Sequence, residues 1–518
     1  MLFRYLLLLL LTGLAPPMLA QTTLVGRVVD QKGQPLPGAN VMLKGTYDGT
    51  TTDSSGAFRF KTARTDSATL VVSYIGYESA QKRLLLSQPT DNMVVRLREL
   101  ANELNTVVIT AGAFEASDSR RMTMLKPLDI VSTAGAGADI TGVMQLLPGA
   151  QRVGEQEGLF VRGGSNLETN VVIDGMIVQN PFFSSLPDVS SRGRFQPFMF
   201  KGTSFSTGGY SAQYGQALSS VLLLNTTDKG SNNGVSLSLN LANTGISYDR
   251  ANEKSSLSAT GYYSNLTPLF ALVRQTVDWT RAPENVGSSL TYRLKTGKAG
   301  MLKTYGMYSD GRVGMNFRDP TSGDGVTAIA IQNRNAFLTS TYTDSWSEGK
   351  WLLYTGLSYS RNSDLMTYDA SNMSRSDERT QVRAVLTRLL GNRAGLTSSV
   401  LFGAEAHRLT LLNTVNGTPY RLNDTYLATF AESELYLTRL LAVRVGGRLE
   451  YNSVIGGVNV APRLSMAYKT GTFSQVSLAA GQFYQTPDYR YLYRNKALGY
   501  ERADHLILNY QIIKNGRT

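Results

Sequence analysis

The sequence predicts a mainly β protein that combines a small N-terminal β-sandwich, a mixed α+β segment and part of a transmembrane antiparallel β-barrel. Three observations predict this class. Short strands alternate with Gly/Pro turns at the start, helix-compatible pieces lie among glycine-rich loops in the middle, and apolar and polar residues alternate from residue 231 onward. Segments that alternate over about ten residues, repeated many times between polar turns, are typical of membrane-spanning β-barrels.

The first 20 residues have the pattern of a secretory signal peptide. Arg4 is followed by the apolar run Leu6 to Leu11, and cleavage is expected between Ala20 and Gln21, although Met18 is larger than the residue usual at its position. This segment is too short to span a membrane. No later run reaches the roughly 18 apolar residues that a spanning helix needs, so no such helix is predicted.

Residues 22–98 are predicted to form the β-sandwich, because five to seven short strands alternate with turns that contain glycine and proline. The stretch GRVVDQKGQPLPGANVMLKGTYDGTTTDSSGAFRF, within this range, resembles the carboxypeptidase-regulatory-like domain. The resemblance implies no activity, and no catalytic group stands out there. A stable periplasmic spacer is the simplest interpretation.

In residues 99–230, Ile140, Val143, Met144 and Leu147 recur at helical spacing before Pro148 and Gly149 end the pattern. Three stretches here, LLPGAQ, EGLFVRGGSNLETNVVIDG and SRGRFQPFMFKGTSFSTGGYSAQYGQALSSVLLLNT, resemble the plug domain of TonB-dependent outer-membrane receptors of the Bacteroidetes type. The resemblance implies that residues 113–230 form a plug inside a barrel.

From residue 231 to 518, strands such as VSLSLNL, VRVGGRLEY and RLSMAYK place apolar residues on one face and charged or polar residues on the other. Charges that face a lumen leave the other face to lipid, which predicts the barrel wall. This stretch supplies about 12 to 14 strands, whereas receptors of the resembled family close at about 22. The chain is therefore interpreted as carrying an incomplete, C-terminally truncated barrel.

Residues 104–112 are interpreted as a linker that carries the TonB box. The proposed box consists of Asn105, Thr106, Val107, Val108, Ile109, Thr110 and Ala111. Its β-branched residues suit a segment that adds a strand to the sheet edge of a partner, and it precedes the plug, where the resembled family carries its box. A first plug strand or a plain linker remains the alternative.

Within the predicted plug, Arg162 and Asp174 are charged residues in otherwise apolar segments, and the family resemblance makes VRGG and IDG structural motifs. We expect Arg162 and Asp174 to hold the plug together and against the wall through paired hydrogen bonds. Gly163, Gly164 and Gly175 are expected to meet backbone requirements.

Catalysis, cofactors and metals are not predicted. The chain lacks GxSxG, P-loop and HExxH motifs and contains no cysteine, and His407 and His505 lie far apart. The net charge of +12 is scattered, and export argues against a nucleic-acid partner. Tyr (27 residues) outnumbers Phe (18) and Trp (3) together, which suits a membrane interface.

These features favour a Gram-negative outer-membrane receptor with periplasmic N-terminal domains, which imports a scarce ligand when TonB and its inner-membrane complex pull on the box. Outer-membrane lipid is the other expected partner. The ligand stays open between an iron chelate, a cobalamin-like molecule, a peptide and an oligosaccharide. Two alternatives are a ligand-sensing outer-membrane protein without transport and a surface β-scaffold.

Overall fold

The computed structural model describes residues 22–97 and 125–512, apart from short gaps. The gaps are residues 32, 44–45, 47, 63, 65, 75–79, 87–89, 126, 155–157, 185, 188, 190–191, 229, 231–232, 298, 320–324, 370, 394–395, 439, 472–473 and 496. The chain divides into two compact units, Met1–Val108 and Ile109–Thr518.

The first unit is a seven-stranded β-sandwich. One sheet has the order β4-β1-β7 and the other β3-β2-β5-β6. Their bounds are β1 (Thr22–Val29), β2 (Asn40–Leu43), β3 (Gly49–Thr51), β4 (Ala57–Thr62), β5 (Ser67–Ser73), β6 (Ala80–Leu85) and β7 (Thr90–Arg96). Side chains from both sheets share one core, in which Leu24, Val41 and Leu70 are fully buried. The sandwich therefore has its own hydrophobic core.

The second unit contains a small inner domain, residues 125–228, built around a four-stranded sheet of order β11-β10-β13-β12. β10 and β13 are parallel and the other pairs antiparallel. Its elements are α2 (Pro127–Ser132), α3 (Ile140–Met144), β8 (Ala150–Gln151), β9 (Phe160–Val161), η1 (Asn166–Glu168), β10 (Thr169–Ile173), β11 (Met176–Ile177), η2 (Pro197–Met199), β12 (Phe200–Ser206) and β13 (Ser220–Thr226).

The helix predicted from the spacing of Ile140, Val143 and Met144 is α3. Asp139 caps its N-terminus by accepting a hydrogen bond from the Gly142 backbone N–H at 3.0 Å. The helix ends before Leu147, which belongs to the turn that precedes Gly149. The predicted helix is confirmed, but it ends at Met144, three residues before Leu147, which the spacing had included.

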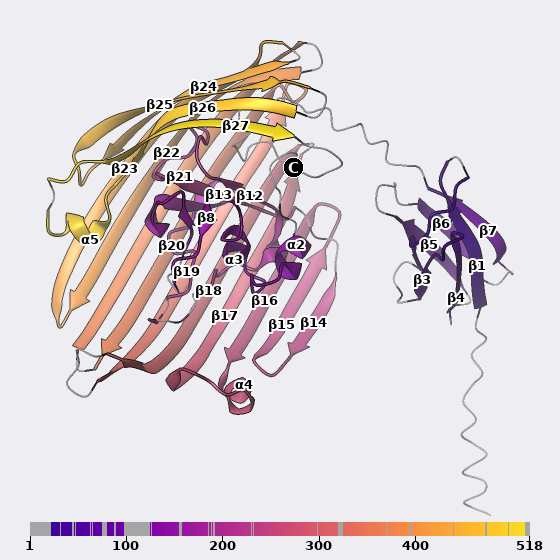
Figure 1. The fold of residues 1–518 in the computed structure, drawn as a ribbon, viewed down its shortest axis with the longest axis horizontal. Coiled ribbons are helices and arrows are strands. Elements are labelled where there is room, and N and C mark those ends of the chain that lie inside the picture. Colours follow the sequence, from indigo (N-terminus) through magenta and orange to yellow (C-terminus); the bar gives the residue numbers. More distant parts are fainter. Residues whose placement is uncertain are drawn as a thin grey trace, which may run out of the picture. The chain divides into compact units, whose positions relative to one another are not determined.

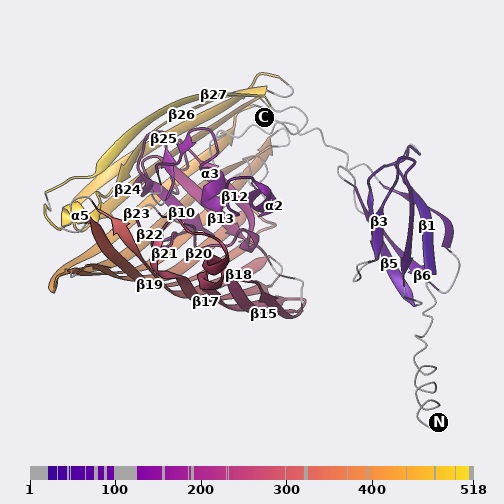
Figure 2. The ribbon, with the colours of Figure 1, turned by 60° about the horizontal axis from the view of Figure 1, so that its bottom comes forward.

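The rest of the second unit is one antiparallel sheet of 14 strands, here called the wall, which curves around the inner domain (Figures 1 and 2). Its strands are β14 (Gly234–Leu239), β15 (Asn243–Ala251), β16 (Ser255–Asn265), β17 (Asp278–Thr296), β18 (Gly300–Arg318), β19 (Val326–Trp346), β20 (Trp351–Tyr368), β21 (Ser371–Arg393), β22 (Leu396–Val415), β23 (Thr418–Tyr436), β24 (Leu441–Asn452), β25 (Gly457–Lys469), β26 (Ser474–Gln485) and β27 (Glu501–Ile512). The prediction of 12 to 14 antiparallel strands is confirmed.

Alternation along the wall strands separates an apolar outer face from a polar inner face. On β24, Val445 and Leu449 are about half exposed on the outside, whereas Arg444 and Arg448 are buried on the inside. This pattern is the one that a lipid-facing wall requires. Among the described residues, β14 and β27 each pair with one strand only, so the sheet has two free edges.

The two ends of the wall differ. One end carries tight connections such as the one at 347–350, beside which Trp346 and Trp351 stack with ring centroids 6.3 Å apart. The other end carries the long connections with α4 (Thr267–Leu272) and α5 (Tyr489–Leu492), together with tight turns such as the one at 416–417. Short turns mark the periplasmic end of outer-membrane barrels and longer loops the outer end. Within the described part of the chain, no helix is both long and apolar enough to cross a membrane.

Candidate functional site

The candidate site is the interface between the inner domain and the inner face of the wall. It has three zones of different chemistry. In the first, the wall holds the main chain of a loop. In the second, amides and carboxylates meet, and in the third, aromatic rings pack.

The first zone is the loop 210–214, whose backbone is held by three wall side chains. Arg463 donates through Nη1 to the carbonyls of Tyr210 (3.2 Å) and Tyr214 (2.8 Å), and also to that of Ser211. Arg448 donates to the carbonyls at 212 and 213, both at 3.3 Å. In the opposite sense, Glu432 accepts from the Ser211 hydroxyl and from the backbone N–H at 212, both at 2.8 Å. The wall thus contacts the backbone of this loop more than its side chains.

A buried ionic layer supports the arginines of this zone. Arg448 pairs with Glu405 and, through Nε at 2.6 Å, with Glu450. Arg383 pairs with the second oxygen of Glu405 at 2.7 Å. All four charged side chains are almost fully buried. Buried charges are tolerated only when they are paired and hydrogen-bonded, so this layer keeps Arg448 in place to meet the loop.

The aromatic ring of Tyr210 lies in the same zone. Arg463 stacks over it at 4.9 Å and over Phe483 of β26 at 4.3 Å. The Tyr210 hydroxyl donates to the Ala217 carbonyl. Burial raises the pKa of Tyr210 far above its usual value, so the hydroxyl stays neutral. Packing and electrostatics therefore both fix this ring against the wall.

The second zone joins residues 180–194 to the amide-rich inner face of β19–β21. Asn180 donates to Asp377 at 2.5 Å, and Ser184 donates to Asp364 at 2.7 Å. Arg194 is buried and donates to Asn333 Oδ1 at 2.8 Å. Here the side chains of the inner domain make the contacts. This zone is polar and largely buried. Its specificity for the inner domain comes from hydrogen bonds, not from apolar packing.

The third zone is aromatic. Phe195 packs against Tyr305 and Phe337 of the wall, with centroid distances of 6.3 and 6.1 Å. Ile140 and Met144 of α3 belong to the same buried cluster. The core of the inner domain therefore continues into the wall.

Asp174 and Gly175 form the turn of the β10–β11 hairpin. Ile173 pairs with Met176, and both turn residues have positive φ (46° and 88°), as a two-residue type I′ turn requires. Asp174 accepts from the Thr226 backbone N–H at 2.9 Å and from its hydroxyl. The wall residue Tyr354 donates to the Asp174 carbonyl at 2.6 Å. The charged residue lies just beyond the strand in which the sequence suggested it.

Arg162 also follows a strand, β9, and has positive φ (52°), as does Gly163 (84°). The Gly164 N–H closes the turn on the Val161 carbonyl at 2.9 Å. The Arg162 side chain is exposed, and it donates to Thr207 Oγ1 at 3.3 Å. Arg162 and Asp174 thus occupy similar turns but have different surroundings.

The connection from the inner domain to the wall is fixed by charge. Asp228 forms ion pairs with Lys303 of β18 at 2.8 Å and with Lys201 at 3.0 Å. Partial burial raises the pKa of the Asp228 carboxyl, and the two ammonium groups outweigh that effect, so the net pKa is lowered. Nearby, Arg293 of β17 donates to Thr226 Oγ1 at 2.8 Å. The hydroxyl of Thr226 therefore bridges Arg293 and Asp174.

The box residues 105–111 and the cleavage residues Ala20 and Gln21 lie outside the described residues. Among the residues that the structure does describe, no group of three or more His, Cys, Asp or Glu side chains is arranged to hold a metal ion. The interface binds the inner domain and positions it against the wall, and we assign it no chemical step.

Sequence reasoning placed Arg444, Arg448 and Arg463 on the inner face but not in contact with a particular loop. It passed over Arg194 and Asn180 entirely. The available signal was alternation, which gives the face of a side chain. It does not give the partner, because Arg463 and Ser211 are 252 positions apart in the sequence.

Comparisons with known proteins agree with this architecture. Residues 24–109 match the family model of the CarboxypepD_reg-like domain. The chain is 30% identical over 229 residues to the TonB-dependent receptor SusC of Bacteroides thetaiotaomicron, covering 41% of this chain and 21% of that protein. It is 26% identical over 225 residues to the TonB-dependent receptor P39 of Formosa agariphila, covering 41% and 20%. The matches thus span about a fifth of the length of these relatives.

Solved structures share the fold at low identity. The outer-membrane transporter YddB of Escherichia coli superposes with a TM-score of 0.59 at 11% identity, over 75% of this chain and 66% of that one. The ferric enterobactin receptor PfeA of Pseudomonas aeruginosa gives 0.57 at 13% identity, over 76% and 70%. The relatives are receptors and transporters, not enzymes. The chain is therefore similar to TonB-dependent receptors over about two fifths of its length, shares the fold of outer-membrane transporters and carries a CarboxypepD_reg-like domain at residues 24–109.

Proposed function

We propose that the chain is the gating part of a receptor that imports a scarce ligand across the outer membrane. In this proposal the signal peptide spans residues 1–20, the sandwich 22–98, the box linker 104–112, the plug 113–230 and the barrel wall 231–518. The plug blocks the lumen until TonB pulls on the box. The ligand is an iron chelate, a cobalamin-like molecule, a peptide or an oligosaccharide.

The observation that carries the proposal is the chemistry of the plug–wall interface. Polar groups supply two of its three zones, and such contacts exchange with water at a net free-energy difference of about 1 kcal/mol per neutral hydrogen bond and about 1.5–3 kcal/mol where one partner is charged. An interface of this kind holds the plug in place and still releases it under a directed pull. Only the third zone is apolar. An interface that was apolar throughout would resist partial release more strongly, because water would then meet newly exposed hydrocarbon.

The energy input is assigned to residues 105–111. A box that adds a strand to TonB depends on backbone hydrogen bonds, so it requires free N–H groups and an extended chain. Proline removes an N–H and blocks strand addition, whereas threonine retains both the N–H and the β-branch. These two residues at one position therefore distinguish backbone pairing from side-chain recognition.

The test uses the receptor in native outer membranes and the purified periplasmic domain of TonB. We expect Val108→Pro to abolish capture of the receptor by immobilised TonB domain, and Val108→Thr to retain it. Ala101→Pro, outside the box, serves as the control for proline as such. Wild-type capture by Val108→Pro would refute the box assignment, and equal loss in Ala101→Pro would show an effect on the linker as a whole.

A further inference from the structure

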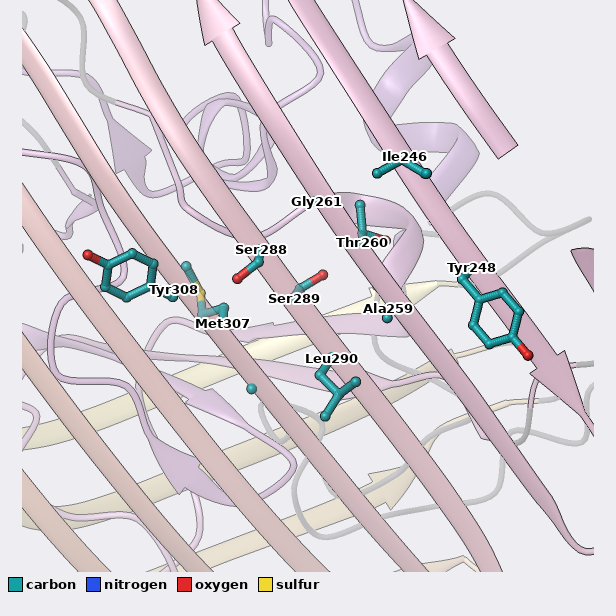
Figure 3. Close-up of a pocket in the computed structure, with 11 residues that line it drawn as sticks. Ile246, Tyr248, Ala259, Thr260, Gly261, Ser288, Ser289, Leu290, Met307 and Tyr308 are labelled. Carbon is teal, nitrogen blue, oxygen red and sulfur yellow. The ribbon is translucent and has the colours of Figure 1, made fainter. Parts of the chain in front are cut away.

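A concave groove lies on the outer, lipid-facing side of the wall, across β15 to β18 (Figure 3). Its volume is about 530 Å³. Ile246 and Tyr248 come from β15, Leu290 from β17 and Tyr308 from β18. Tyr308 points outward, because its neighbour Met307 is buried against the inner domain. The strand register puts the other three side chains on the same face as Tyr308. Each of the four is between 41% and 53% exposed, so they form a rim around a depression.

The depression exists because small residues occupy the outward positions between the rim residues. In the strand register, Ile246 faces Gly261, Gly261 faces Ser288, and Ser288 faces Tyr308. In the next row, Tyr248 faces Ala259, and Leu290 faces Gly306. A Cβ added at Gly261 would meet only Ile246, at 3.9 Å. The space above these small residues is therefore open, and a neighbour does not fill it.

The groove faces hydrocarbon in the half of the wall nearer the tight turns. Leu290 lies six residues before the end of β17 at Thr296, and Tyr308 lies eight residues after the start of β18 at Gly300, so both are on the tight-turn side of the middle of their 19-residue strands. That end is periplasmic in barrels with short turns on one side and long loops on the other. No residue of the lining carries a formal charge. The groove is therefore continuous with the lipid interface of the inner leaflet and offers nothing to an ionic headgroup.

We propose that this groove binds an acyl chain of a phospholipid from the periplasmic leaflet. A flexible hydrocarbon chain fits an uncharged groove between rows of larger side chains, whereas an unfilled groove would forfeit dispersion contacts on both sides. The volume lies in the range of small-molecule sites, roughly 300–1,000 Å³, and suits part of one chain. The headgroup stays at the membrane surface, and the groove selects the chain only.

A second groove, whose lining is mainly apolar and also includes Glu405 and Glu450, both paired with Arg448, supports the same proposal. It lies on the outer face across β21 to β25, with a volume of about 470 Å³. Ala384 faces Ala404, and Ala404 faces Thr429, so small residues again lie side by side on neighbouring strands. Larger outward residues such as Leu427 and Leu449 border them. The two grooves lie on distant parts of the wall but on the same outer face. Both therefore face the same surroundings, the lipid of the membrane.

The test is photo-crosslinking in outer-membrane vesicles that contain the receptor and a phosphatidylethanolamine with a diazirine in its acyl chain. We expect several-fold more adducts on peptides with Leu290 and Tyr308 than on the peptide with Leu357, an outward residue of similar exposure outside the grooves. Gly261→Leu fills the groove and should reduce these adducts to the Leu357 level. Gly447→Leu, an outward change with open space around it and outside both grooves, should leave them unchanged.

Ser288→Leu, also in the groove, is a second filling variant, and heat-modifiable migration on gels shows which variants are folded. Equal adduct yields at Leu290 and Leu357 would overturn the proposal. So would a folded Gly261→Leu or Ser288→Leu that retains the wild-type yield. A parallel experiment with a diazirine-bearing lipid A tests the leaflet: groove adducts from lipid A alone would refute the periplasmic source, and crosslinks to another protein would refute the lipid.

Discussion

At the scale of single residues, Gly175 shows how a glycine serves two requirements. Its φ of 88° suits the β10–β11 turn, and a Cβ there would lie 2.5 Å from the Tyr354 hydroxyl and 2.8 Å from its ring. Gly163 has nearly the same φ (84°), but a Cβ there would meet nothing within 4 Å. The two positions therefore separate backbone strain from close approach to the wall.

We expect Gly175→Ala to destabilise the receptor more than Gly163→Ala. Both variants carry the cost of a positive φ, on the order of 1 kcal/mol. Only Gly175→Ala also forces the wall to shift, which adds about 1–3 kcal/mol as overpacking does in cores. The measurement is the temperature at which heat-modifiable migration is lost in detergent. Equal shifts of this temperature for the two variants would show that the contact with Tyr354 does not contribute to stability.

At the scale of elements, alternation and turn chemistry predicted the secondary structure well. The seven strands of the sandwich, the helix at 140–144 and the wall strands all follow local patterns. Sequence reasoning could not predict which inward side chain meets which loop. That depends on strand register and on how the inner domain sits, which contacts as distant as Ser211 and Glu432 determine.

The turn that leads into β4 of the sandwich gives an element-scale prediction. Asp53 Oδ1 accepts from the Ser55 hydroxyl and N–H, both at 2.8 Å, and from the Ala57 N–H at 2.9 Å. The bond from the Ser55 hydroxyl, followed by those from the Ala57 and Ser55 N–H groups, lowers the pKa of Asp53. A lowered pKa in the folded state adds stability above the unfolded-state pKa, about 3.9, and this stability is lost as the pH falls through the folded value.

We therefore expect Asp53→Ala to lower the thermal midpoint of the sandwich at pH 7, and the difference from wild type to shrink as the pH falls below about 4. The sandwich has its own core and forms a separate compact unit, so fragment 22–98 suits the measurement by circular dichroism. Asp53→Asn keeps one acceptor without the charge and should show a smaller, pH-independent difference. A difference for Asp53→Ala that is constant from pH 7 to pH 3 would contradict the prediction.

At the scale of the whole molecule, the wall holds the inner domain in two ways. Around 180–194 the contacts depend on side chains of the inner domain, such as Asn180 and Arg194. Around 210–214 they reach its backbone, through Arg463, Arg448 and Glu432. Contacts to the backbone depend little on the side chains of the loop. Substitutions of wall side chains should therefore weaken the binding of loop 210–214 to the wall more than substitutions of side chains in the loop.

This asymmetry predicts the effect of Arg463→Met on opening of the inner domain. The variant has a similar side-chain volume but leaves buried carbonyls of the loop without a donor, at about 1–3 kcal/mol each. Even one such loss raises the open population about fivefold to 150-fold, because 1.4 kcal/mol corresponds to a factor of ten. Gln213→Ala changes the loop itself, and we expect it to alter the open population little.

The chain contains no cysteine, so a single Ala217→Cys reports opening without background labelling. Ala217 is 1% exposed, packed in a cluster with Tyr210 and Phe483, and a large maleimide reagent reaches it only after the loop has left the wall. We expect the labelling rate in outer-membrane vesicles to rise at least several-fold with Arg463→Met and to stay near the reference with Gln213→Ala. Equal rates in both folded variants would mean that the backbone contacts do not hold the loop. A labelling rate that rises with Gln213→Ala but not with Arg463→Met would show that side chains of the loop, not contacts to its backbone, keep the loop on the wall.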